Sequence, residues 1–176
     1  LGGCGKSAVE CSSPDATTVT TSLLQDSLVN AVYEKTRSAS ADTDVSRSSI
    51  RAAVAQLGLD IADVRTSRED PNSTKRFCEA TLKVDFSADV LDKAEQARST
   101  AGLGTVTQLA DANNIDREAN SFSDKVEYDV QPTDKGDKVY SETNKDTPIL
   151  SLASDVVAAS LMQSAIQRAS VAAQQA

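Results

Sequence analysis

Histidine is absent from this chain of 176 residues. Its absence removes the commonest general base and the commonest transition-metal ligand of proteins. Hydrolases whose nucleophile depends on a His base are therefore excluded, and so are zinc sites that contain His. Carboxylates, Lys and Tyr remain, but the sequence shows no active-site pattern of these residues. We expect a protein that is not an enzyme and that needs neither a metal nor a cofactor.

Aromatic residues, basic charge and long apolar runs are scarce as well. Aromatics make up 3% of the chain and Trp is missing, so the core must be built mainly from aliphatic side chains. The net charge of −8 argues against a nucleic-acid partner, because such proteins present a basic face. No uninterrupted run of 18 apolar residues occurs, and we expect no transmembrane segment.

The opening stretch LGGCGKS fits two motifs. Gly5-Lys6-Ser7 matches the end of a phosphate-binding loop, but the first Gly of that loop would stand before Leu1. Cys11-Ser12-Ser13-Pro14 also follows where the helix of such a loop should continue. Leu1-Gly2-Gly3-Cys4 instead resembles the lipobox of bacterial lipoproteins, in which the Cys thiolate accepts diacylglycerol. We expect Cys4 to be lipidated, with a signal peptide upstream.

Two further cysteines lie in the body of the chain. If Cys4 carries lipid, Cys11 and Cys78 remain as a pair. In an oxidising compartment such as the periplasm we expect a disulfide between them, although two buried free thiols are the alternative. This disulfide would join the start of the first helix to the middle of a strand.

Hydrophobic periodicity predicts an α+β fold. Helices are expected from Ser13-Pro14 to about Thr36, after Ser46 to an end at Gly58, from Ser87 to about Ser99, near 105–112, and from Thr147-Pro148 onward. Strict alternation over 75–86 predicts a strand with one wet face, paired with a weaker strand over 59–67. A second hairpin is expected from Val126–Val130 and Val139–Thr143. The expected architecture is a curved antiparallel four-stranded sheet (two hairpins) packed on a long C-terminal helix with an N-terminal helix.

The C-terminal helix has an unusually uncharged surface. Between Ile149 and Ala176 only Asp155 and Arg168 carry charge. A continuous apolar stripe runs along it, formed by Ile149, Leu152, Val156, Ala159, Met162, Ile166, Ala169 and Ala173. A helix of this kind either packs broadly in a core or binds a partner, and the sequence leaves both open.

Three segments carry a family resemblance: CSSPDATTVTTSLLQDSL, CEATLKVDFSADV and VEYDVQPTDKGDKVY. Together with the lipobox, they resemble small outer-membrane lipoproteins of Gram-negative bacteria, in which a helix is followed by curved antiparallel hairpins. The resemblance covers roughly residues 9–175. It implies a fold and a compartment, and it assigns no functional residue besides Cys4.

These observations predict a lipid-anchored protein on the periplasmic side of the outer membrane. Residues 1–12 would be the lipobox and tether, and 13–176 a single globular α+β domain. The membrane would be contacted through lipid on Cys4, and the body would bind an envelope protein or another envelope component without catalysis. The alternative is an inhibitor or exclusion factor, whose acidic surface blocks a basic enzyme such as a muramidase or an incoming element.

Overall fold

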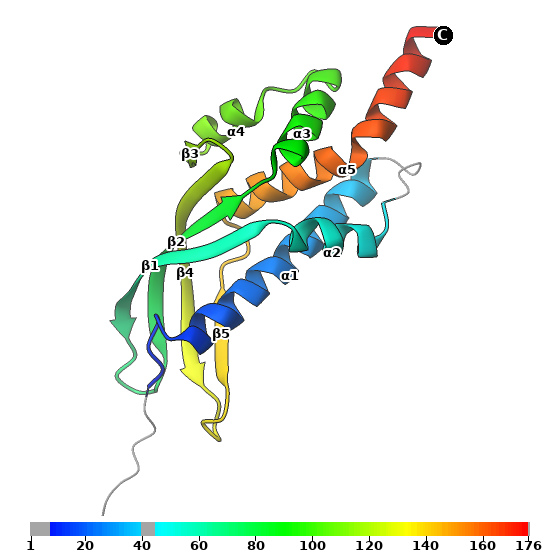
Figure 1. The fold of residues 1–176 in the computed structure, drawn as a ribbon. Helices are drawn as coiled ribbons and strands as arrows, with labels where there is room; N and C mark the ends of the chain where they lie inside the picture. Colours follow the sequence, from blue (N-terminus) through cyan, green and yellow to red (C-terminus); the bar gives the residue numbers. More distant parts are fainter. Residues whose placement is uncertain (1–7, 40–44, 176) are drawn as a thin grey trace, which may run out of the picture.

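The computed structural model describes residues 8–39 and 45–175, and its class is α+β (Figure 1). The helices within these ranges are α1 (Pro14–Ala39), α2 (Arg47–Ala55), α3 (Ala88–Thr100), α4 (Val106–Ala112) and α5 (Pro148–Gln175). The strands are β1 (Gly58–Glu69), β2 (Arg76–Asp85), β3 (Asp116–Glu118), β4 (Ser121–Pro132) and β5 (Val139–Thr143).

Polar caps begin the helices where the sequence predicts them. Ser46 accepts a hydrogen bond from the backbone N–H of Ser49, and Ser87 accepts one from Val90. Thr105 and Gln108 form a reciprocal capping box at α4. Each contact satisfies a backbone donor that the first helical turn cannot pair internally, which fixes where the helix begins.

Gly58 does not end α2, contrary to the prediction. The helix is capped by Gln56, whose φ of −86° is right-handed, and Gly58 is already the first residue of β1. A Cβ on Gly58 would lie 3.1 Å from the Cβ of Asp85, its partner on β2. The glycine therefore serves the close approach of two strands and not the end of a helix.

The sheet has five antiparallel strands, where the sequence predicted four. Their order is β1-β2-β4-β3, and β5 also pairs with β4. The long strand β4 is shared: residues 121–123 pair with β3, and 128–132 pair with β5. The additional strand was missed because β3 has three residues, all exposed, and therefore no apolar alternation.

An irregularity in β1 explains its weak sequence pattern. The pairing with β2 shifts between Ala62 and Arg65, and Asp63 has a positive φ of 53°. An extra residue in one strand reverses the side to which later side chains point. Alternation therefore breaks within 59–67, although the strand continues to Glu69.

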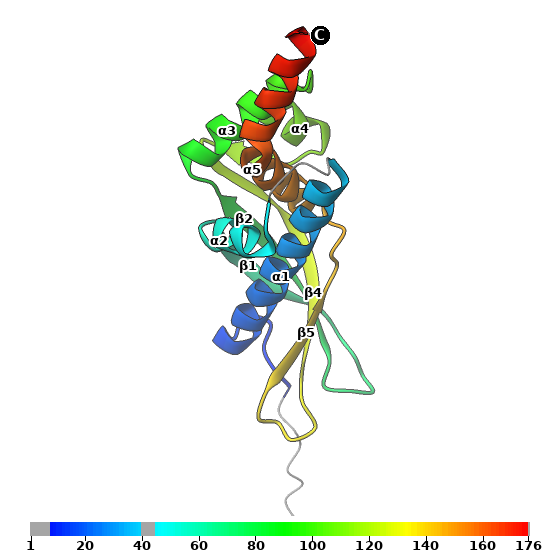
Figure 2. The ribbon, with the colours of Figure 1, turned by 90° about the vertical axis from the view of Figure 1, so that its right-hand side faces the viewer.

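One face of the sheet is apolar and lies under the helices. α1 crosses this face against β5 and β1, while α5 reaches β4 and packs mainly on α3 and α1 (Figures 1 and 2). The opposite face carries the charged side chains of the strands, as expected for an antiparallel sheet with one wet side. The largest fully buried side chains include Leu24, Leu28, Ile50, Leu82, Phe122, Ile149 and Leu152.

The two halves of α5 have different surroundings. From Ile149 to Met162 the apolar stripe is buried in the core, whereas no residue of 163–175 is fully buried. The second half extends away from the body (Figure 1). By length and mean hydropathy, α5 could cross a membrane, although it contains no uninterrupted run of 18 apolar residues. Half of its most apolar stretch is buried inside the fold.

A buried hydroxyl pair joins α1 to the sheet edge. Thr20 Oγ1 donates to the carbonyl of Ala16 at 2.8 Å and lies 2.8 Å from Ser141 Oγ on β5. Since the Thr20 proton is already used, Ser141 must be the donor in the second bond.

We predict that Thr20→Val lowers the free energy of unfolding by about 1–3 kcal/mol, because the buried Ser141 hydroxyl loses its acceptor. Urea unfolding measures the effect. The double variant Thr20→Val/Ser141→Ala should lose less than the sum of the two single variants, and exposed Thr18→Val is the matched control. Additive losses would contradict the coupling.

Candidate functional site

The disulfide predicted between Cys11 and Cys78 is present. The two residues are 67 positions apart, their Cα atoms are 5.7 Å apart, and both side chains are buried. Cys78 is the third residue of β2, so the bridge reaches the start of the strand and not its middle. Cys4 and the rest of the lipobox lie outside the described residues.

The segment before α1 is held tightly against the body. Tyr128 on β4 donates its hydroxyl to the Cys11 carbonyl at 3.0 Å, and Arg76 forms ion pairs with Glu10 and Glu69. Val9 also packs against the core. Residues 8–12, which the sequence assigns to the tether, therefore belong to the folded body as far as they are described.

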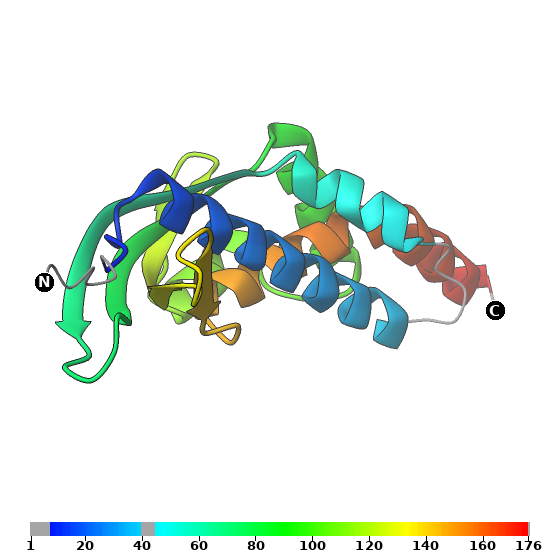
Figure 3. The same ribbon diagram turned by 90° about the horizontal axis from the view of Figure 1, so that it is seen from below.

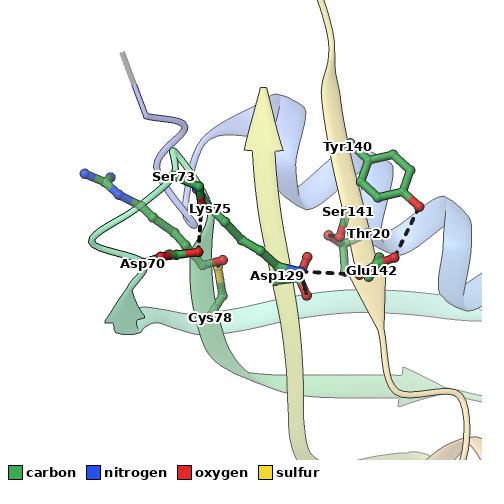
Figure 4. A network of polar contacts seen from close by, with 10 residues as sticks. Thr20, Asp70, Ser73, Lys75, Cys78, Asp129, Tyr140, Ser141 and Glu142 are labelled. Atoms are coloured by element: carbon green, nitrogen blue, oxygen red, sulfur yellow. Dashed lines mark hydrogen bonds and ion pairs between the residues drawn. The ribbon is translucent and has the colours of Figure 1, made fainter. Parts of the chain in front are cut away.

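A polar network lies on the wet face of the sheet near the disulfide (Figure 4). Lys75 Nζ is 3.0 Å from Asp129 and 3.4 Å from Glu142, two residues that face each other across β4 and β5. Tyr140 donates to Glu142 at 3.3 Å. Lys75, at the end of the β1–β2 hairpin, thus links this hairpin to β4 and β5.

In this region the pKa values of Asp70, Lys75 and Tyr128 are all shifted further from neutral pH. The hydrogen bond to Asp129 raises the pKa of Lys75, and the bonds from Asn72 N–H and the Ser73 hydroxyl lower the pKa of Asp70. Burial raises the pKa of Tyr128 to about 12. These shifts favour the charged forms of Lys75 and Asp70 and the neutral form of Tyr128.

A groove opens at the other end of the molecule, between the ends of α1 and α3 and the middle of α5. Its volume is about 460 Å³. Ala97, Ala101, Leu103, Ala158, Ala159, Met162 and Ile166 give it an apolar lining, and Glu34, Lys35, Arg98 and Asp155 are its charged residues. Such a surface fits an apolar side chain or helix face better than a charged small molecule.

Polar contacts lie beside the groove on α1, α3 and α5. Lys35 on α1 pairs with Asp155 on α5 at 2.5 Å, and Arg98 on α3 donates to the carbonyl of Gly104 at 2.7 Å. Sequence reasoning missed this site, because its lining comes from three distant segments. The one signal was the apolar stripe of α5, which continues past the point where the core ends.

The wet face of the sheet has a second, polar hollow of about 340 Å³. Arg65 and Glu79 form a 2.5 Å ion pair beside it, and Lys125 and Glu127 also line it. No group of three or more His, Cys, Asp or Glu side chains is placed to hold a metal ion within the part of the chain that the structure describes.

Comparisons with known proteins return no similarity: no family model, no curated protein and no solved structure matches the chain. The resemblance to outer-membrane lipoproteins therefore stays a prediction from the sequence.

We predict that Cys11→Ala/Cys78→Ala lowers the free energy of unfolding by about 4 kcal/mol, because the open 67-residue span regains chain entropy when unfolded. Denaturant titration of chains that also carry Cys4→Ser measures this loss. Reductant should destabilise the bridged chain and leave the double variant unchanged. A double variant as stable as the bridged chain would contradict the prediction.

Tyr128 gives a pH-dependent prediction. Its pKa rises from 10.0 to about 12 on folding, so the folded state holds the phenol proton more tightly than the unfolded state. The stabilisation is complete below pH 10 and is lost as the pH rises toward 12. Urea unfolding over this interval should show a steeper loss for the parent chain than for Tyr128→Phe. Equal slopes would refute a buried, protonated Tyr128.

Proposed function

We propose that this chain is a lipid-anchored lipoprotein of the bacterial outer membrane, facing the periplasm, whose body binds another component of the envelope without catalysis. The observation that carries the proposal is the Cys11–Cys78 disulfide. It accounts for both cysteines of the body, so that Cys4, within Leu1-Gly2-Gly3-Cys4, is the one cysteine left for lipid. A disulfide is also typical of proteins exported to an oxidising compartment.

Acyl chains on Cys4 would supply the membrane attachment. Each buried methylene contributes about 0.8 kcal/mol to membrane partitioning, and stable anchoring needs more than one chain. An anchor of this kind needs no membrane-spanning helix, and the acidic body stays in water beside the bilayer.

The start of the described chain and the groove lie at opposite ends of the molecule (Figure 1). The described chain begins beside the disulfide, at the end where the β1–β2 and β4–β5 hairpins turn (Figures 1 and 3). The groove is formed at the opposite end by α1, α3 and α5. Lipid attached near the hairpins would leave the groove uncovered. We propose it as the surface by which the protein binds its partner.

The inhibitor alternative has less support. The net charge of −8 is its one support, and on the wet face Glu79, Asp129 and Glu142 already pair with Arg65 or Lys75. No surface among the described residues specifically favours inhibition, and this function stays a prediction.

The anchor is tested by expressing the chain behind a lipoprotein signal peptide in a Gram-negative host. We predict that the mature protein begins at Cys4, fractionates with outer membranes and carries the added mass of acyl chains on that residue. Intact-protein and peptide mass spectrometry measure both. Cys4→Ser should lose the acyl mass and the membrane fraction while keeping the Cys11–Cys78 bridge. An unmodified Cys4 in the parent chain would refute the anchor.

A further inference from the structure

The end of α3 holds an apolar side chain in solvent beside the groove. Gly102 has a left-handed φ of 70°, and its N–H donates to the Ser99 carbonyl at 3.1 Å. The N–H of Leu103 donates to the Arg98 carbonyl at 2.8 Å. In this Schellman motif the residue after the glycine usually packs on an apolar residue of the last helical turn. Here that residue is Arg98, and Leu103 stays 57% exposed. The turn thus fixes the backbone of two residues that both line the groove.

The side chain of Arg98 is anchored at one nitrogen and unused at the others. Its Nε donates to the Gly104 carbonyl at 2.7 Å. A Cβ on Gly104 would lie 2.8 Å from Gln108 Oε1, the atom that accepts the Thr105 N–H in the capping box of α4. The terminal nitrogens of Arg98 have no hydrogen-bond or ion-pair partner among the described residues. A cation that is already positioned loses little side-chain freedom when it binds an anion.

The other charges of the groove leave Arg98 as the cation that can meet a ligand. Lys35 is paired with Asp155 at 2.5 Å. The Glu34 carboxylate on α1 has no partner in the described ranges, but Glu34 is exposed to water, whereas Arg98 is half-buried. Water weakens the field of an exposed charge more than that of a half-buried one. The groove therefore favours an anionic group at its α3 wall over a cationic group at its α1 wall.

We infer that the groove binds a fatty acid, a single alkyl chain that ends in a carboxylate. The chain would lie on the apolar lining, and the carboxylate would accept hydrogen bonds from the terminal nitrogens of Arg98, whose planar fork matches it. The inference names the envelope component of the proposed function, and it rests on that proposal for the choice of the groove. It does not depend on the lipid anchor at Cys4.

The dimensions of the groove suit a single chain. Its α5 wall from Asp155 to Ile166 is about 17 Å long, at 1.5 Å per residue. Its volume of about 460 Å³ lies in the range of roughly 300–1,000 Å³ for small-molecule sites. A helix of the same length and a diameter of about 10 Å would occupy about 1,300 Å³ and rest largely on the rim. An alkyl chain, in contrast, can lie within the groove and cover its lining.

Titration calorimetry of the purified Cys4→Ser chain with dodecanoate, at concentrations below micelle formation, tests the site. The affinity should fall about two- to fourfold for each methylene removed in decanoate and octanoate, because less apolar surface is covered. Arg98→Gln should weaken dodecanoate binding at least tenfold, since it removes the charge that the carboxylate meets. Arg168→Gln is the matched control: it removes the same charge from an exposed position of α5 outside the groove, and the affinity should not change.

A second variant tests the place of the chain without entering the core. Ala101 lines the groove and is exposed, so Ala101→Trp should fill the space of the ligand and weaken dodecanoate binding at least tenfold. Ala172→Trp adds the same side chain at an exposed position outside the groove and should have no effect. Glu34→Gln should keep or strengthen the binding, because it removes a negative charge from the opposite wall. Circular dichroism and urea unfolding check that each variant stays folded.

Four outcomes would overturn the inference. The folded chain does not bind dodecanoate, or it binds with an affinity that neither Arg98→Gln nor Ala101→Trp lowers. Dodecylammonium binds as tightly as dodecanoate, so that Arg98 does not select the anion. Dodecyl phosphate binds more tightly than dodecanoate, so that the headgroup is not a carboxylate. Each of these results leaves the acyl mass on Cys4 of the parent chain untouched, and failure of the fatty-acid site is therefore distinguishable from failure of the lipid anchor.

Discussion

Burial of the apolar face of the sheet under α1 is the interaction on which the rest of the structure depends. With few aromatic side chains, the core relies on many aliphatic contacts, and Phe86 and Phe122 form its edge-to-face ring pair with centroids 5.5 Å apart. α5 closes the core from the side of α3 and α1 and reaches β4. Because full burial along α5 ends at Met162, the same helix that completes the core also projects from it.

The disulfide fixes the other end of this arrangement. It ties the chain just before α1 to β2, while the Tyr128 hydroxyl and Arg76 hold the neighbouring backbone and Glu10. A covalent link between two buried positions removes conformations chiefly from the unfolded chain. The protein thus has a polar, disulfide-bridged end at the hairpins and an apolar, helical end at the groove. A tether at the first and a partner at the second would not compete for the same surface.

Local signals predicted the elements with strong caps or strict alternation. Ser87 and Thr105 begin helices because their hydroxyl groups accept backbone hydrogen bonds within a few residues, which is a property of the local sequence. β2 was predictable because Cys78, Ala80, Leu82 and Val84 are buried on one side. β3 and the irregularity at Asp63 were not, since both depend on the strand paired alongside them. Gly58 was misread because its neighbour Asp85 is distant in sequence.

The sequence by itself determined most helix starts, the main strands and the acidic charge, because each follows from short spacing or composition. It predicted the pairing of Cys11 with Cys78 only on the assumption that Cys4 carries lipid, and the structure shows the bridge. Only the tertiary structure decided which part of the uniform apolar stripe on α5 is core and which is surface. Ile149 and Ile166 have the same side chain on the same helix, but the first is enclosed by the body and the second lies in a groove open to solvent. Burial depends on which distant segments surround a residue, and here those segments are the ends of α1 and α3.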